Sequence, residues 1–518
     1  MNEQNRLPVP HPEGEQSLAP TTGSEIALLA ETFSGRIHVE WDPDAPVTPM
    51  GQLAFFIDFL KTAELFSPWV EDCPLDYASN NAPKPVDVLG TLLLSVLAGH
   101  RRYAHMATLR CDTVNPALLG MDKVVSVDSA RRAFVHADAQ ECRFWQWTHL
   151  RRCWETLLDH PWILDVDTSV KVLYGHQEGA VLGYNPTKPG RPSHVLHTYF
   201  AGNARLVLDV EIRPGNETAA KYTMPGLWAL LDDLPAHKRP AFIRADCAFG
   251  NERDMNDAEA REMDYLFKLR QSPRVKALIG QLFSHNDWTA AGQGWQGVDT
   301  TLRLMGWSRS RRVVVLRRRI RGELALKDNQ ARLGQAELAC VELCEGGAAY
   351  EYAVLVTSLK EPVATIAQHY RDRADMENIY DELKNQWGWG GYTTRDMHRC
   401  QVMARTVAQV YNWWTIYAGL AVPDRHAEAI TSRPLLLYAV GRQVRHAGKT
   451  VLLLTSIHAK AQEVERSLKA VADFLDHIRT TARQLNWTER WRLILDRAFA
   501  RLLIREHPGN SPPLPALT

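Results

Sequence analysis

The sequence lacks the features that mark a secreted, a membrane-spanning or a disordered chain. Only eight cysteines are scattered over 518 residues, which is typical of reduced thiols rather than of a disulfide framework. The longest apolar run, Leu89 to Gly99, is about half of the roughly 20 residues that a membrane-spanning helix needs. No basic segment followed by an apolar stretch opens the chain, so no signal peptide is expected. These absences predict a cytoplasmic protein, and a hydrophobic fraction of 45% predicts a folded one.

Net charge is also absent, because 60 Lys and Arg residues balance 60 Asp and Glu residues. Taken alone, this balance argues against a nucleic-acid partner. The charges are segregated, however: residues 1–60 carry nine acids and two bases, residues 303–321 carry eight arginines and no acid, and residues 441–505 carry thirteen Lys or Arg and six acids. Charge runs are more often solvated faces than binding sites, but Val313 to Leu316 predict a strand that orders the arginine block and favours DNA.

The hydrophobic pattern divides the chain into six regions. We expect a disordered tail at 1–24, a helical region at 25–160, a mixed α/β region at 161–284, a β-rich segment at 285–349, a return of the α/β region at 350–423 and a helical region at 424–518. Helices are predicted at 51–65, 85–99, 128–137 and 141–158. The segment around Asp128 could equally present a recognition helix to DNA or fill a bundle. The pair Cys340 and Cys344 is interpreted as small buried hydrophobes rather than a zinc site.

The middle of the chain alternates predicted strands and helices. Strands are expected at 162–168, 170–174, 194–212, 240–246 and 264–268, with helices at 219–231 and 252–261 between the later ones. Further strands follow at 295–304, 311–320, 336–342 and 350–359, then a long helix at 363–388. A strand at 450–455 interrupts the otherwise helical C-terminal region. The fold class is therefore α/β, with a mixed sheet flanked by helices.

Two aspartates end predicted strands of this sheet. Asp167 closes the strand at 162–168, and Asp246 closes the strand at 240–246. Magnesium prefers hard oxygen ligands and leaves room for water and phosphate, so carboxylates at a sheet edge suit it. Strand-end aspartate is also common as a turn or cap residue, which makes either residue alone weak evidence.

The predicted helix at 363–388 carries a more specific pattern. Its residues Tyr370, Arg373, Glu377 and Lys384 share one narrow face at about 100° per residue. A stripe of salt bridges is the structural alternative. The functional interpretation is a carboxylate, Glu377, that completes a metal site while Arg373 and Lys384 hold phosphates. Two metal ions about 4 Å apart can activate an attacking hydroxyl and stabilise the leaving oxygen of a phosphodiester.

The spacing of these four residues resembles the Tyr, Arg, Glu, Lys signature of DDE transposases of bacterial insertion sequences. Within that group the chain resembles the insertion-sequence family numbered 1380, and the resemblance spans roughly residues 85–480. Its supporting segments are residues 165–168, 183–186, 190–193, 244–249 and 352–357.

The resemblance implies a ribonuclease-H-like catalytic domain interrupted by a β-rich insertion. Asp167, Asp246 and Glu377 would form the catalytic, metal-binding triad, with Mg²⁺ as cofactor and Mn²⁺ able to substitute. Asp165 lies on the same strand face as Asp167, and Asp167 is preferred because Thr168 follows it. The implied partners are terminal inverted repeats and target DNA, bound by a synaptic homodimer associated with the nucleoid, and residues 25–160 are the expected DNA-end-binding domain.

Further residues are expected to contact DNA. They are Tyr370, Arg373, Lys384, Trp307, Arg311, Arg312 and Arg318. Related transposases pass through a hairpin stabilised by an aromatic side chain that stacks on a flipped base, and Trp307 or Trp295 could supply it, although a core tryptophan is at least as good an interpretation of each. Two functions remain: an active transposase, and a transposase-derived DNA-binding protein that does not cleave. Three converging carboxylates favour the first, because they would repel phosphate in a binding module.

Overall fold

The computed structural model describes residues 28–77, 79, 81–186, 188–283, 287–320, 342–343, 349–456, 460–480 and 484–502. The chain forms two compact units, residues 1–46 and 47–518. The described part of the first unit holds an antiparallel hairpin of β1 (Leu28–Thr32) and β2 (Gly35–Val39). This hairpin was not expected from the sequence. The predicted tail at 1–24 lies outside the described residues.

The second unit begins with the predicted helical region. Its strand β3 (Val47–Thr48) is followed by α1 (Leu53–Thr62), α2 (Phe66–Glu71), α3 (Pro85–Leu97), the 3₁₀ helix η1 (Tyr103–Cys111), α4 (Asn115–Leu118), α5 (Val127–Arg132), α6 (Ala139–Trp154) and η2 (Leu157–Asp159). Proline at the first position of α3 suits a helix start, since its missing N–H has no helical partner there. Asp138 caps α6 by accepting hydrogen bonds from two backbone amides of its first turn.

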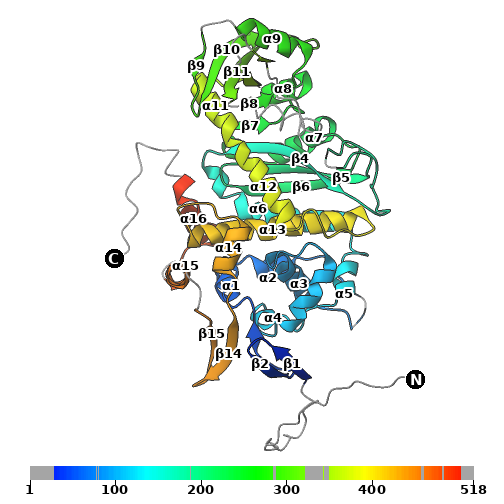
Figure 1. Cartoon of the computed structure of the whole chain (residues 1–518), viewed down its shortest axis with the longest axis vertical. Coiled ribbons are helices and arrows are strands. Elements are labelled where there is room, and N and C mark those ends of the chain that lie inside the picture. The colour runs from blue at the N-terminus through cyan, green and yellow to red at the C-terminus, as the bar shows by residue number, and fades with distance from the viewer. Residues whose placement is uncertain are drawn as a thin grey trace, which may run out of the picture. The chain divides into compact units, whose positions relative to one another are not determined.

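A ten-stranded mixed sheet forms the centre of this unit (Figure 1). Its strands are β4 (Ile163–Val172), β5 (Ser193–Ala201), β6 (Leu206–Pro214), β7 (Phe242–Ala245), β8 (Tyr265–Lys268), β9 (Thr289–Ala290), β10 (Trp295–Leu302), β11 (Arg311–Ile320), β12 (Glu342–Leu343) and β13 (Ala349–Thr357). Their order is β6-β5-β4-β7-β8-β13-β11-β10-β9, with β12 paired to β13. The pairs β4–β7 and β7–β8 are parallel, and the other pairs of the sheet are antiparallel.

The predicted mixed α/β architecture is therefore confirmed, with differences in detail. The expected strand 194–212 is two strands, β5 and β6, because the chain turns between Ala201 and Leu206. Helices α7 (Ala219–Asp232) and α8 (Glu252–Ala260) connect β6 to β7 and β7 to β8, and η3 (Ala236–Lys238) and α9 (Pro273–Phe283) complete this part. The strands β10 and β11 of the predicted insertion extend the same sheet, since β11 pairs with β13 along eight residues.

The long helix expected at 363–388 is two helices. Helix α11 (Val363–Asp372) ends and α12 (Ala374–Asn385) begins at Arg373. Helix α13 (Met397–Ala421) follows and packs against β6 and α6. Its Trp413 and Trp414 are almost fully buried, as predicted for core residues.

Side-chain amides of α13 cover the free edge of the sheet at β6. Asn412 accepts a hydrogen bond from the Val207 N–H at 2.9 Å and donates one to the Val207 carbonyl at 2.8 Å. Gln401 does the same for the Ile212 N–H and the Val210 carbonyl. These bonds satisfy backbone groups that an edge strand would otherwise leave open to another strand.

The C-terminal region is less helical than expected. Helix α14 (Ala429–Leu436) leads into β14 (Gly441–His446) and β15 (Lys449–Leu454), and α15 (Ala461–Thr480) and α16 (Trp487–Ala498) follow. The strands β15, β14 and β3 form a separate three-stranded sheet in that order. The strand β14 was missed by the sequence pattern. No helix in the described ranges is both long enough and apolar enough to span a membrane.

Candidate functional site

Asp246 lies just after the end of β7, as expected, whereas Asp167 lies inside β4 and does not end it, because the strands expected at 162–168 and 170–174 form one continuous strand. Val166 of β4 is in register with Ala245 of β7, so the next residues, Asp167 and Asp246, occupy corresponding positions. Asp246 follows the last residue of β7, and its carboxylate accepts a hydrogen bond from the Ala248 N–H at 2.9 Å. That turn bond fixes the aspartate where the strand ends.

Helix α12 brings Glu377 near enough for its charge to raise the pKa of Asp167. Tyr380 lies one turn after Glu377 and packs edge-on against Phe200 of β5, with ring centroids 5.4 Å apart. Met376, Ile379 and Leu383 anchor the same helix in the core, while the Glu377 side chain is exposed. The apolar side of α12 therefore fixes the helix on the sheet and leaves a carboxylate toward solvent beside the aspartates.

An ion pair joins the two halves of this site. Arg373, at the junction of α11 and α12, places Nη2 2.7 Å from Oδ2 of Asp167. Both side chains are largely buried, 11% and 19% exposed respectively. Burial lowers the pKa of Arg373, but the charges of Asp167 and Asp246 more than offset this and hold it above its usual value.

The carboxylates of the site repel one another. Burial raises the pKa of Asp167 to about 6, and the charges of Asp246 and Glu377 add to that rise, whereas the Arg373 charge and the Thr168 N–H oppose it. Burial also lowers the pKa of Lys384, and the negative charge of Asp167 partly restores it. Asp167, Asp246, Glu377, Arg373 and Lys384 thus form one electrostatically coupled cluster, which we call the carboxylate cluster.

The carboxylate cluster has the donor chemistry for a hard divalent cation but is not assembled as a metal site. In the part of the chain that the structure describes, no three His, Cys, Asp or Glu side chains are close enough together to hold a metal ion. The guanidinium of Arg373 supplies the positive charge beside Asp167 instead. A cation would relieve the carboxylate repulsion that raises the pKa of Asp167, so the oxygen donors fit such an ion.

Asp165, the alternative first aspartate, has a different partner. Its two oxygens accept hydrogen bonds from Nε and Nη2 of Arg244, both at 2.6 Å. The Asp165 side chain is 1% exposed and that of Arg244 is 3% exposed. The pair is fully buried and bidentate, which gives Asp165 a structural role between β4 and β7 and leaves Asp167 as the aspartate of the carboxylate cluster.

Tyr370 lies on α11, one turn before Arg373. It is partly buried and packs on a small core cluster that includes Ile366 and Val314. With Arg373 at the junction and Glu377 and Lys384 on α12, the four predicted residues do not share one continuous helix.

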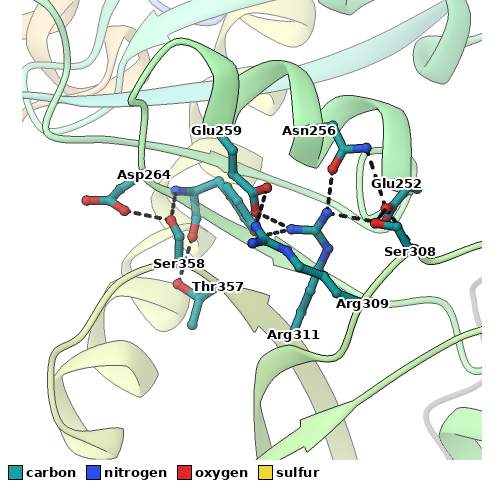
Figure 2. Close-up of polar contacts among 10 residues, drawn as sticks. Glu252, Asn256, Glu259, Asp264, Ser308, Arg309, Arg311, Thr357 and Ser358 are labelled. Carbon is teal, nitrogen blue, oxygen red and sulfur yellow. Dashed lines mark hydrogen bonds and ion pairs between the residues drawn. The ribbon is translucent and has the colours of Figure 1, made fainter.

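The predicted DNA-binding role of Arg311 is not supported by its surroundings. Figure 2 shows its guanidinium among the carboxylates of α8, where it pairs with Glu252 and Glu259 and hydrogen-bonds Asn256 at 2.6 Å. The Arg311 side chain is 2% exposed. Its charge is neutralised inside the protein and ties β11 to α8, so it is unavailable to a phosphate in this structure.

The other predicted contacts of the arginine block are similarly engaged. Arg312 donates hydrogen bonds to both oxygens of Asp299, with Nη2 to Oδ2 at 2.6 Å, and another to the Glu361 carbonyl at 2.8 Å. Arg318 pairs with Glu351 and stacks on Trp295 at 5.0 Å from the ring centre. Trp307 is only 6% exposed and belongs to the core, which is the alternative interpretation given for it above. A ring buried in this way cannot stack on a base.

Sequence reasoning missed Arg244 and Tyr380, which position the site without carrying its chemistry. Arg244 had a signal: a charged residue inside the apolar strand Phe242–Ala245 requires a buried partner. Tyr380 had none, because an aromatic residue on a helix does not reveal which strand it contacts. Cys340 and Cys344 lie outside the described residues, and the six described cysteines are free thiols.

Comparison with known proteins yields a match over most of the chain. A family model described as transposase DDE domain group 1 matches residues 76–475. No curated protein matches the chain. Among solved structures, the chain is similar to a cryo-EM structure of a piggyBac transposase synaptic complex with hairpin DNA. The sequences are 10% identical, the match covers 90% of this chain and 87% of that chain, and the TM-score is 0.38.

Proposed function

The chain belongs to the transposase DDE domain group 1 family, and on that premise we propose that it cuts the ends of a transposon and joins them to target DNA. The observation that carries the proposal is the carboxylate cluster. Asp167 and Asp246 sit at corresponding positions of parallel strands, and Glu377 raises the pKa of Asp167 from a neighbouring helix. Polynucleotidyl transfer needs carboxylates that can be brought together around metal ions, and these three lie within electrostatic reach of one another.

We assign the catalytic and metal-binding roles to Asp167, Asp246 and Glu377. When bound, Mg²⁺, or Mn²⁺ in its place, would activate water or a 3′ hydroxyl and stabilise the leaving oxygen of the phosphodiester. Asp167 must be ionised to hold a cation, and a pKa near 6 leaves it mostly ionised at neutral pH.

Arg373 and Lys384 are proposed to position the phosphate. Arg373 now neutralises Asp167, and its planar guanidinium can instead present two N–H donors to a phosphate. Lys384 lies close enough to feel the Asp167 charge, and its half-buried ammonium would give up little hydration on meeting a phosphate oxygen. Tyr370 supports this arrangement by fixing the end of α11 against the core.

The finer classification is also a proposal. The order β6-β5-β4-β7-β8, with β4, β7 and β8 parallel, supports a ribonuclease-H-like catalytic domain. The spacing of Tyr370, Arg373, Glu377 and Lys384 supports the insertion-sequence family numbered 1380 and a bacterial source. A synaptic homodimer on terminal inverted repeats, end binding by residues 25–160 and association with the nucleoid follow from that assignment.

Excision in cells tests the proposed function. A donor plasmid would carry a marker between the DNA segments that flank the coding gene, and rejoined donor would be detected by sequencing. We expect excision with the natural chain and none with Asp246→Asn, because the carboxamide cannot replace an anionic ligand. Asp473→Asn, which removes an exposed carboxylate of α15, is the matched control and should excise normally. Excision by Asp246→Asn at the natural rate would refute the assignment, and binding of the ends without excision by any variant would favour a non-cleaving DNA-binding protein.

A further inference from the structure

The hairpin of β14 and β15, residues 441–454, carries a concentration of positive charge. Residues 438–456 contain Arg442, Arg445 and Lys449, together with His446, and no Asp or Glu. All four side chains are exposed. Within the described residues, no carboxylate forms an ion pair with any of the three cations. We call this hairpin the basic ribbon.

The pairing of the two strands places cations on both faces of the basic ribbon. Residues that pair directly share a face, so Arg442, paired with Leu453, lies on the same side as the His446–Lys449 pair. Arg445 pairs with Thr450 on the opposite side. The strands have six residues each, which corresponds to a length of about 20 Å.

The base of the basic ribbon is fixed to the protein. Gly441 and Arg442 pair with β3, and the Gly51 N–H donates to the Ala439 carbonyl at 2.7 Å. The contact is too close for a side chain, since a Cβ on Gly51 would lie 2.5 Å from Leu454 Cδ2 and 2.8 Å from the Ala439 oxygen. A ribbon anchored in this way loses little conformational freedom when it binds a partner.

The basic ribbon differs from much of the arginine block of β11 in its ion pairs. Arg311, Arg312 and Arg318 of the block are each paired with a carboxylate of this chain. The cations of the basic ribbon remain available to bind a phosphate. The sequence pattern did not identify β14, the strand that carries Arg442 and Arg445.

We propose that the basic ribbon binds duplex DNA in the major groove. The choice of DNA as the partner rests on the proposed function. A two-stranded ribbon fits this groove, which is about 12 Å wide and about 8.5 Å deep. Cations on both faces would reach phosphates on both walls of the groove, and the absence of acids avoids repulsion. The exposed Leu453 at its base suits contact with the apolar edge of a thymine methyl group.

Fluorescence anisotropy with a fluorescein-labelled duplex of mixed sequence, in EDTA, tests this proposal. The test variant is Arg445→Gln with Lys449→Gln, and the matched control is Arg466→Gln with Lys469→Gln on α15, which removes the same charge from exposed positions. The logarithm of the DNA association constant falls as the logarithm of the salt concentration rises. Loss of two phosphate contacts should make this slope shallower by about 2 and weaken binding by about sixtyfold near 0.1 M salt. The control should change affinity less than about twofold.

Binding by the ribbon variant at the natural affinity, or equal loss in both variants, would overturn the proposal. The proposal would also be overturned if the ribbon variant sedimented at a higher mass than the natural chain while its DNA affinity stayed the same. The role of the cations would then be to prevent the edge strand β15 from pairing with a second copy of the chain. Cleavage of element ends in Mg²⁺ is measured separately on the same preparations. If the natural chain cleaves and the ribbon variant binds DNA as well as the natural chain does, only this inference fails. If the ribbon variant binds DNA more weakly but the natural chain does not cleave, only the proposed function fails.

Discussion

Replacing Asp165 and Asp167 one at a time separates a structural carboxylate from a functional one. Asp165→Asn keeps the shape of the side chain but leaves Arg244, only 3% exposed, without its full countercharge. Breaking a buried ion pair by removing one partner costs about 3–5 kcal/mol. Two hydrogen bonds of 2.6 Å and near-complete burial place this pair well within that range.

Asp167→Asn should behave differently. Its carboxylate is mostly ionised at neutral pH, but a pKa raised to about 6 means that this ionised form costs free energy in the folded protein relative to the unfolded chain, and neutralising it removes that cost. Arg373 loses its partner at the same time, which offsets the gain. We therefore expect the free energy of unfolding to change by less than about 1 kcal/mol.

Urea unfolding followed by circular dichroism measures both changes. Asp165→Asn should reduce the free energy of unfolding by about 4 kcal/mol, and the double variant Asp165→Leu with Arg244→Met should recover most of it, because an apolar pair replaces a buried ion pair at little cost. Excision should be lost in Asp167→Asn, and Asp165→Asn should retain it at temperatures where it is folded. If Asp165→Asn unfolds at the same free energy as the natural chain but no longer excises, the assignment of a structural role to Asp165 and a functional role to Asp167 is refuted.

Two further predictions concern the framework around the site. Asn412→Leu removes both hydrogen bonds that cover Val207 at the β6 edge, and should lower the free energy of unfolding by about 3 kcal/mol in urea, since a buried N–H and a buried carbonyl lose their partners. Burial raises the pKa of Asp254 to about 6, so this carboxyl binds its proton more tightly when folded, and the stability that it contributes is present below about pH 4 and lost as the pH rises toward 6. Asp254→Asn should remove up to about 3 kcal/mol of that decline in a pH series of unfolding curves, and an identical pH dependence in the variant would contradict the burial argument.

Local signals in the sequence were sufficient for much of the fold. Helix α3 begins at the predicted Pro85 because an apolar run starts there, and β11 has the predicted bounds Arg311–Ile320 because Val313 to Leu316 form an apolar centre between arginines. The sequence pattern did not predict the turn between β5 and β6, although Gly202 lies in it. The apolar residues on both sides of the turn were interpreted as a single strand. The strand β14 was missed because polar and charged residues occupy most of it, and its pairing with β15 and β3 is tertiary information.

The sequence pattern named the residues of the carboxylate cluster but not the partners of the arginine block. Asp246 follows the end of β7 as expected, and Glu377 was proposed from its spacing, but Asp167 was wrongly expected at a strand end because β4 continues to Val172. The burial of Arg311 among acids was not foreseen because Glu259 and Glu252, which neutralise it, lie 52 and 59 residues away along the chain. Charge in a strand indicates DNA only when the fold brings no carboxylate to it, and no local pattern reports that.

The most direct test of the central claim is strand cleavage by the purified protein. Labelled duplexes containing the element ends would be incubated with Mg²⁺, and the products resolved on denaturing gels. We predict nicks that expose 3′ hydroxyls at the ends, with at least a thousandfold loss in both Asp246→Ala and Glu377→Ala, about 4 kcal/mol in the barrier. Undiminished cleavage by either variant would contradict the carboxylate cluster as the catalytic site.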